Sequence, residues 1–195
     1  MTPFGLPTTV TVSGTDYPVR TDFRVILEIF VMLEDPELSD PDKTEALLRM
    51  FYEDRPPAKD TDAAVRAFLD FLEPSTWSLR TSQQAGVAIR SPRPRSKPGL
   101  VNWSHDFPLL VGPVNRVLGT ECRALKYLHW YTFLAAYMDI DPESVFSQTL
   151  RIREKLRSGK KLEKVEREFY RRNPDLVDPP KALTSIEKDL LKNWS

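Results

Sequence analysis

The spacing of the prolines constrains the fold of this chain more than any other feature of its sequence. Seventeen of the 195 residues are proline and only seven are glycine, whereas an average protein holds about 5% proline and about 7% glycine. Because proline is excluded from helix interiors, proline-free stretches mark where long helices can form. Most of these stretches carry helical periodicity, so the sequence predicts a helical protein with proline-marked joints. The stretches are residues 19–35, 42–55, 58–73, 75–91, 114–141, 143–173 and 181–195.

A short segment near the N-terminus departs from the helical pattern. Residues 8–12 alternate threonine with valine, Ser13-Gly14 supplies a turn, and a second extended piece runs over 15–19. This pattern predicts a two-stranded hairpin, in which Pro18 fits an edge position. An isolated hairpin is marginally stable in water, so we expect it to pack on the helices or to join the sheet of another chain.

Three amphipathic helices are predicted between residues 21 and 73. The first begins after Thr21 or Asp22, either of which can cap it. The second follows Asp40-Pro41, and the third follows Asp60-Thr61. The first helix is apolar on two sides, so it is either central in the fold or shared with a partner. Its first stripe is Phe23, Ile26, Leu27, Phe30 and Val31, and its second is Val25, Ile29 and Leu33.

Two further helices are predicted between residues 103 and 138. One is capped within Trp103-Ser104-His105-Asp106 and runs to about Leu118, where Gly119 can stop it. The next, from Glu121 to Met138, is the most apolar of all. The apolar face of the former is Leu110, Val114, Val117 and Leu118. The latter has one stripe made of Ala124, Tyr127, Leu128, Tyr131, Leu134, Ala135 and Met138, and a second made of Trp130, Phe133 and Tyr137.

The remaining helices are shorter or more strongly charged. Asp141-Pro142 restarts a helix, residues 151–172 form a charged helix or helix pair broken near Ser158-Gly159, and residues 185–194 form a short terminal helix. The inward-facing side chains of the helix after Asp141-Pro142 are expected to be Val145, Phe146, Thr149 and Leu150. Together the elements predict a mainly α fold, a helical bundle with a small N-terminal β-hairpin.

The zero net charge of the chain hides an uneven distribution. Residues 1–75 hold 7 basic and 15 acidic side chains, whereas residues 151–172 hold ten basic and four acidic ones. We expect an N-terminal part over 1–75, a basic proline-rich linker or loop over 76–101, and a helical part over 102–195 that packs with the first as one unit. The acidic and basic parts can pair within one chain, or head to tail between chains.

Several kinds of chemistry have no basis in this sequence. Two histidines and one cysteine are too few for a standard zinc site, and neither a glycine-rich phosphate loop nor a Gly-x-Ser-x-Gly elbow occurs. Cys122 and His129 lie two turns apart on a predicted helix, about 10 Å, too far for a nucleophile and its base. We therefore expect no enzyme, no metal and no cofactor.

Charge and hydropathy also limit the partners. Basic and acidic residues cancel at 28 each, so the chain projects no large positive field toward nucleic acid. The ten cations of residues 151–172 allow a nucleic-acid contact, but the four glutamates among them favour ion pairing on a solvated helix face. The longest nearly uncharged apolar run, 127–138, holds 12 residues, against about 20 for a membrane span. The single cysteine and the lack of a secretory signal predict a cytosolic protein.

Three motifs in a fixed order resemble the bacteriophage "gp-fifteen" family of phage and prophage tail-region proteins. They lie in the blocks TDFRVILEIFVMLEDPELSDPDKTEALLRMFY, KYLHWYTFLAAYMDID and LRIREKLRSGKKLEKVEREFYRRN. The best matches are the Asp22-Phe23-Arg24 opening, the Leu-His-Trp-aromatic-x-Phe core over 128–133, and the Arg-Glu-Phe-Tyr-Arg stretch over 167–171. Where the family has Asp-Phe-x-x-Asp before the aromatic core, this chain has His105-Asp106-Phe107-Pro108.

The resemblance implies a role in virion morphogenesis. Genes of this family usually lie beside those for the major tail protein and the tape measure, the position of a tail assembly chaperone that keeps the tape measure protein soluble. The implied partners are the tape measure protein, the major tail tube protein and further copies of the chain, in the cytoplasm of the bacterial host. The alternative is a small structural tail or head-tail component that stays in the virion.

A chaperone of a long amphipathic helix needs an exposed apolar groove ringed by charge. Two predicted helices carry more apolar surface than one core face needs, residues 23–33 and 127–138. One hypothesis is that their second stripes contact the tape measure or a neighbouring subunit; the other is that both helices are central in one bundle. The candidate partner-binding residues are Trp130, Phe133, Tyr137, Val25, Ile29 and Leu33.

Overall fold

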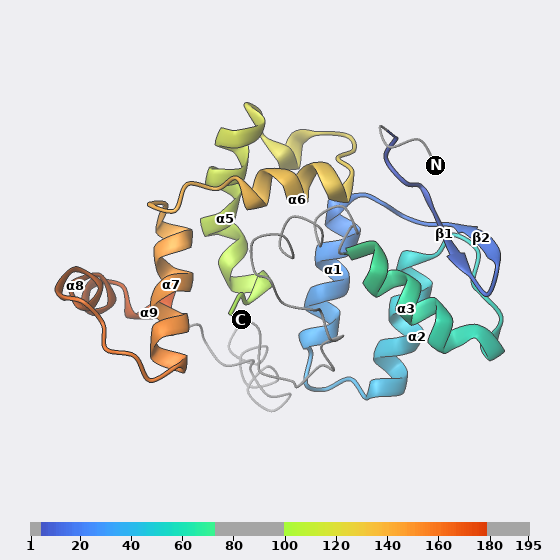
Figure 1. Cartoon of the computed structure of the whole chain (residues 1–195), viewed down its shortest axis with the longest axis horizontal. Coiled ribbons are helices and arrows are strands. Elements are labelled where there is room, and N and C mark those ends of the chain that lie inside the picture. Colours follow the sequence, from blue (N-terminus) through green and yellow to red (C-terminus); the bar gives the residue numbers. More distant parts are fainter. Residues whose placement is uncertain (1–4, 73–99, 179–195) are drawn as a thin grey trace, which may run out of the picture. The chain divides into compact units, whose positions relative to one another are not determined.

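The computed structural model describes residues 5–72 and 100–178, which fall into two compact units. The first comprises the described residues 5–21 and 40–72, and the second comprises 22–39 and 100–178. The chain therefore passes twice between the units. The helix that follows the hairpin belongs to the second unit, whereas the segments before and after it belong to the first (Figure 1).

The first unit consists of a hairpin and two α-helices. Strands β1 (Thr9–Val12) and β2 (Thr15–Pro18) pair antiparallel, with Val12 opposite Thr15. Ser13 and Gly14 have φ values of 49° and 84°, so the turn takes the left-handed conformation that suits a two-residue hairpin loop. This confirms the hairpin. The helices are α2 (Asp40–Phe51) and α3 (Thr61–Leu72), which a short 3-10 turn at Ala58–Asp60 precedes.

The hairpin packs on the helices of its own unit. Strand β1 contacts α3, and Val12 is buried. Arg20, two residues after β2, links the hairpin to the end of α2, since its backbone N–H donates to Phe51 O at 2.8 Å. Its guanidinium donates to the carbonyls of Arg49, Met50 and Tyr52, which a helix C-terminus leaves without intrahelical partners.

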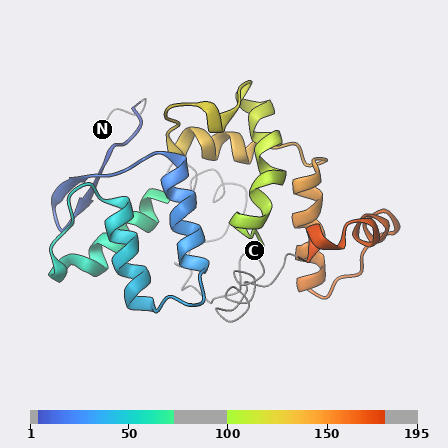
Figure 2. The same cartoon turned by 180° about the vertical axis from the view of Figure 1, so that it is seen from behind.

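All regular secondary-structure elements described in the second unit are helices. Helix α1 (Phe23–Glu34) packs against α5 (Trp103–Leu118) and α6 (Trp130–Met138). Both views show α6 lying crosswise to α1 and α5, near one end of α1 (Figures 1 and 2). The unit is completed by a 3-10 turn at Cys122–Ala124 and by α7 (Val145–Arg157), α8 (Lys164–Arg172) and α9 (Pro174–Val177).

An aromatic core joins α1, α5 and α6. The ring of Phe23 stacks on Phe133 with centroids 4.6 Å apart, and Phe30 contacts both Trp103 and Trp130. Such pairs contribute about 0.5–1.5 kcal/mol each beyond the area they bury. The mainly α fold class with a small hairpin is thus confirmed, as is the break of the charged segment at Ser158-Gly159, where α7 ends.

The predicted helix from Glu121 to Met138 is wrong in its first half. Residues 125–129 are not helical, with extended backbone at Leu125 and His129, and α6 begins only at Trp130. Tertiary hydrogen bonds replace the intrahelical ones, because Leu128 O accepts from the N–H of Phe23 and Arg24 donates to the carbonyls of Leu125 and Lys126. The imidazole of His129 then caps α6 by accepting from the N–H of Tyr131 at 3.0 Å.

Several side chains predicted to face inward are exposed. They lie at helix ends or in the extended segment, where periodicity no longer fixes the direction of a side chain. The large ones are Val31, Val117, Tyr127, Met138 and Val145, and Ala124 and Ala135 are exposed as well. The predicted terminal helix over 185–194 and most of the predicted linker over 76–101 lie outside the described residues.

Candidate functional site

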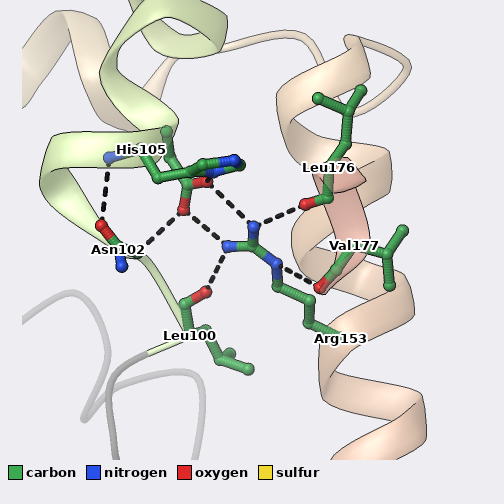
Figure 3. Close-up of polar contacts among 7 residues, drawn as sticks. Leu100, Asn102, His105, Arg153, Leu176 and Val177 are labelled. Carbon is green, nitrogen blue, oxygen red and sulfur yellow. Dashed lines mark hydrogen bonds and ion pairs between the residues drawn. The ribbon is translucent and has the colours of Figure 1, made fainter. Parts of the chain in front are cut away.

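A buried ion pair between α5 and α7 forms the most connected polar cluster of the second unit (Figure 3). The Asp106 side chain is 1% exposed and the Arg153 side chain 7%. Two parallel hydrogen bonds join them: Nη1 of Arg153 to Oδ2 at 2.5 Å, and Nη2 to Oδ1 at 2.9 Å. This bidentate geometry holds both groups in a fixed orientation.

The remaining N–H groups of Arg153 all bind backbone carbonyls. Nε donates to Val177 O at 3.0 Å, Nη2 donates to Leu176 O at 2.5 Å, and Nη1 donates to Leu100 O at 2.8 Å. A guanidinium has five N–H donors, and all five are used here. Because the three carbonyls belong to α9 and to the segment before α5, one side chain connects α7 to both.

Asp106 is equally well satisfied. Its Oδ2 also accepts from the backbone N–H of Asn102 at 2.8 Å, and its Oδ1 lies 2.9 Å from Nδ1 of His105. The Asn102 side chain in turn caps α5, since its Oδ1 accepts from the N–H of His105 at 3.0 Å. A carboxylate in the first turn of a helix is also favoured by the helix dipole.

Burial and hydrogen bonding act in opposite directions on the pKa of Asp106. Burial alone would raise it, but the hydrogen bonds from Arg153, His105 and Asn102 outweigh burial and lower the pKa of this carboxyl. Two neighbours respond to the same charge. Burial raises the pKa of Glu34 and of Tyr137, and the Asp106 carboxylate raises each of them further.

This arrangement suits Asp106 to holding helices in place and not to binding or transforming a ligand. Four hydrogen bonds occupy its carboxylate, and the guanidinium that faces it has no donor left for a ligand. The cluster therefore orients α5, α7 and α9 relative to one another within the second unit. That the chain has no catalytic activity stays a prediction.

A second polar cluster joins the start of α1 to the extended segment before α6. Asp22 caps α1 by accepting from the N–H of Arg24 at 2.9 Å, and two more bonds hold the Arg24 guanidinium on the same carboxylate. Burial raises the pKa of Asp22, but the hydrogen bonds with Arg24 and Leu128 lower it below its ordinary value. The cluster explains why His129 and its neighbours are held in an extended conformation.

The six candidate partner-binding residues divide into two groups. Trp130, Phe133 and Ile29 are buried, so an incoming partner cannot reach them in this conformation. The other three, Val25, Leu33 and Tyr137, are half-buried. The structure brings Tyr137 into ring contact with Trp103 and with Phe146, 5.9 Å between the latter centroids. Partner binding by these six residues stays a prediction.

The buried ion pair was missed from the sequence, although a signal for it exists. Asp106 lies four residues before Leu110 on the apolar face of α5, and Arg153 lies seven residues after Phe146 on that of α7. Two opposite charges, each on an apolar helix stripe, favour a buried pair because an unpaired buried charge is strongly disfavoured.

Exposed apolar side chains gather where α6 ends and α7 begins. Met138 is 61% exposed and follows Tyr137, and the exposed Val145 precedes Phe146, whose ring contacts Tyr137. We call Tyr137, Met138 and Val145 the α6–α7 corner. The connection between the two helices carries three exposed acidic residues, Asp139, Asp141 and Glu143. Exposed apolar and acidic side chains therefore lie on the same connection between helices, where Glu143 also pairs with Arg151 at 3.7 Å.

Neither a membrane span nor a metal site is found within residues 5–72 and 100–178. No helix there is long and apolar enough to cross a membrane. In the same ranges, no three His, Cys, Asp or Glu side chains are grouped so that they could hold a metal ion.

Comparison with known protein families gives a match to the first part of the chain. Residues 5–91 match the model of a family described as "Bacteriophage Gp15 protein". The match covers all described elements of the first unit and also α1 of the second. No curated protein and no solved structure matches the chain.

Proposed function

Residues 5–91 of this chain belong to the Bacteriophage Gp15 family, and from this premise we propose that the protein is a phage tail assembly chaperone that binds and solubilises the tape measure protein. The family match is the observation that carries the proposal. The resemblance of two later blocks, 126–141 and 150–173, to tail-region proteins of the same family adds to it.

The α6–α7 corner is the surface that we propose for the tape measure protein. A chaperone of a long amphipathic helix must offer apolar side chains that are exposed before the partner arrives. Met138 and Val145 are exposed in this way, and methionine adapts its flexible side chain to varied partners. Acidic residues beside the corner suit a partner helix whose apolar stripe is flanked by lysine or arginine.

Co-expression with the tape measure protein tests the proposal. We expect the tape measure protein to become soluble and to co-purify with this chain. A tape measure protein that stays insoluble and unbound would contradict the chaperone function and favour a structural component of the tail or head-tail region.

Two variants then separate a surface effect from a folding effect. Met138→Asp places a charge on the corner, so we expect normal helicity and about tenfold weaker capture of the tape measure protein. Val117→Asp is the matched control, because Val117 is also an exposed apolar residue in the last turn of a helix but lies on α5. Equal loss of capture in the two variants would place the binding surface elsewhere.

A further inference from the structure

Helix α3 of the first unit carries an alternating charge pattern on its exposed side. Asp62, Arg66 and Asp70 follow one another at intervals of four residues and are all exposed. Residues four apart lie on one side of a helix. Leu69, next to Asp70, is 54% exposed. Among the described residues, these three charged side chains form no ion pair within 4 Å.

Helix α8 of the second unit carries the same pattern with every sign reversed. Lys164, Glu168 and Arg172 are again four residues apart and exposed. Val165, next to Lys164, is 75% exposed, and α8 buries none of its side chains. Glu168 and Arg172 form an ion pair within the helix, at 2.5 Å.

The two patterns match when the helices run antiparallel. Asp62 then faces Arg172, Arg66 faces Glu168, and Asp70 faces Lys164. The same alignment places Leu69 opposite Val165, because Leu69 is the seventh residue after Asp62 and Val165 precedes Arg172 by seven. A parallel alignment would pair the charges equally well but would separate the two apolar side chains by about 9 Å.

We propose that α3 of one copy of this protein docks antiparallel on α8 of a second copy. Among the residues that the structure describes, Leu69 and Val165 are both exposed, so both patches are open to a second copy. Because the two patches differ, one such contact leaves an α3 and an α8 unpaired, so it either closes into a two-fold pair or ring or continues into an open chain of subunits.

We expect the contact between α3 and α8 to be weak. Exposed ion pairs contribute little each, and one Leu–Val contact buries a small area. Association through it therefore needs a high local concentration, such as that of copies arranged along a long helical partner. The proposal goes beyond the chaperone function and does not depend on it.

Site-specific cross-linking between two single-cysteine variants tests the pairing. A Leu69→Cys chain is mixed with a Val165→Cys chain and treated with a short bis-maleimide, so that only cross-links between copies join the two positions. The unmodified chain is the blank, because its single cysteine, Cys122, is buried. A Met138→Cys chain is the matched control for Leu69→Cys, since Met138 is similarly exposed.

We expect the 69–165 cross-link to form about tenfold more readily than the 138–165 cross-link and to weaken with added salt. Lys164→Asp with Arg172→Asp should lower its yield about tenfold. Asp62→Lys with Asp70→Lys in the other chain should then restore it. Equal yields for 69–165 and 138–165, or a yield that charge reversal leaves unchanged, would overturn the proposal.

Discussion

Arg153 and Asp106 show how one pair of side chains can organise several helices. The guanidinium donates two of its N–H groups to the carboxylate and three to the carbonyls of Leu100, Leu176 and Val177. Such a pair is not by itself evidence of high stability, because burying two charges carries a desolvation penalty. Breaking the pair is costly, however, since one buried charge then has no counter-charge.

Removal of the guanidinium should destabilise the second unit strongly. For Arg153→Ala we expect the free energy of unfolding to fall by about 3–5 kcal/mol, because Asp106 stays buried without its counter-charge. Arg151→Ala on the same helix is the control: Arg151 is exposed and lies 3.7 Å from Glu143, so its loss should cost under about 1 kcal/mol. Urea unfolding followed by circular dichroism measures both, and equal losses would contradict a structural role of the pair.

The lowered pKa of Asp106 predicts a loss of stability in acid. Because the folded state holds this carboxyl below its ordinary pKa of 3.8, the folded state binds fewer protons than the unfolded state near that pH. The contribution is complete above the ordinary pKa and is lost as the pH falls through the folded value. In Asp106→Asn, the free energy of unfolding should therefore depend less steeply on pH below about 4 than in the unmodified chain.

The charged partners could be foreseen only in part from the sequence. Periodicity identifies the stripes on which Asp106 and Arg153 lie, but it says nothing about which side chain 47 residues away completes the pair. The carbonyls of Leu100 and Leu176 leave no trace in the sequence at all, since every residue has one.

At the scale of single elements, periodicity predicted most helices and failed for residues 121–129. Helix α1 begins after Asp22 and α5 ends at Leu118, as predicted, but α5 is capped one residue earlier than expected, by Asn102, and contains Pro108 and Pro113. The segment before α6 has an equally regular apolar pattern, yet its backbone bonds go to α1. Tertiary hydrogen bonds of this kind override local propensity, and a sequence does not reveal them.

The start of α6 depends on the side chain of His129. His129→Ala removes the acceptor for the Tyr131 N–H, and we expect a loss of about 0.5–2 kcal/mol in the free energy of unfolding. His129→Asn should recover part of the loss, because asparagine is a good N-cap. Thermal unfolding of the two variants measures the difference. If alanine and asparagine destabilise equally, the role of His129 lies in packing and not in the cap.

At the scale of the whole molecule, the path of the chain links the two units. The described residues assign α1 to the unit that also contains α5, α6 and α7, whereas the sequence predicts an N-terminal part over 1–75. That prediction follows composition, which changes near residue 75. Composition cannot reveal that Phe23 stacks on Phe133, 110 residues later in the chain, which is the kind of contact that places α1 in the second unit.

A fragment that lacks α1 should therefore fail to fold alone. Residues 100–195 lose Phe23, Ile26 and Ile29, all fully buried in the intact chain. We expect this fragment to be poorly helical by circular dichroism and to gain helicity when a peptide of residues 22–39 is added. A peptide with Phe23→Asp and Ile26→Asp is the control and should have no effect. Full helicity of the fragment without any peptide would contradict this view of the second unit.

Quantitative mass spectrometry of purified phage particles and of the infected-cell lysate tests the assembly function most directly. A tail assembly chaperone leaves before the particle is complete, so we predict that the chain is abundant in the lysate, bound to the tape measure protein, and missing from intact particles. Its presence in intact particles at a fixed copy number would contradict the chaperone function and identify a structural component of the virion.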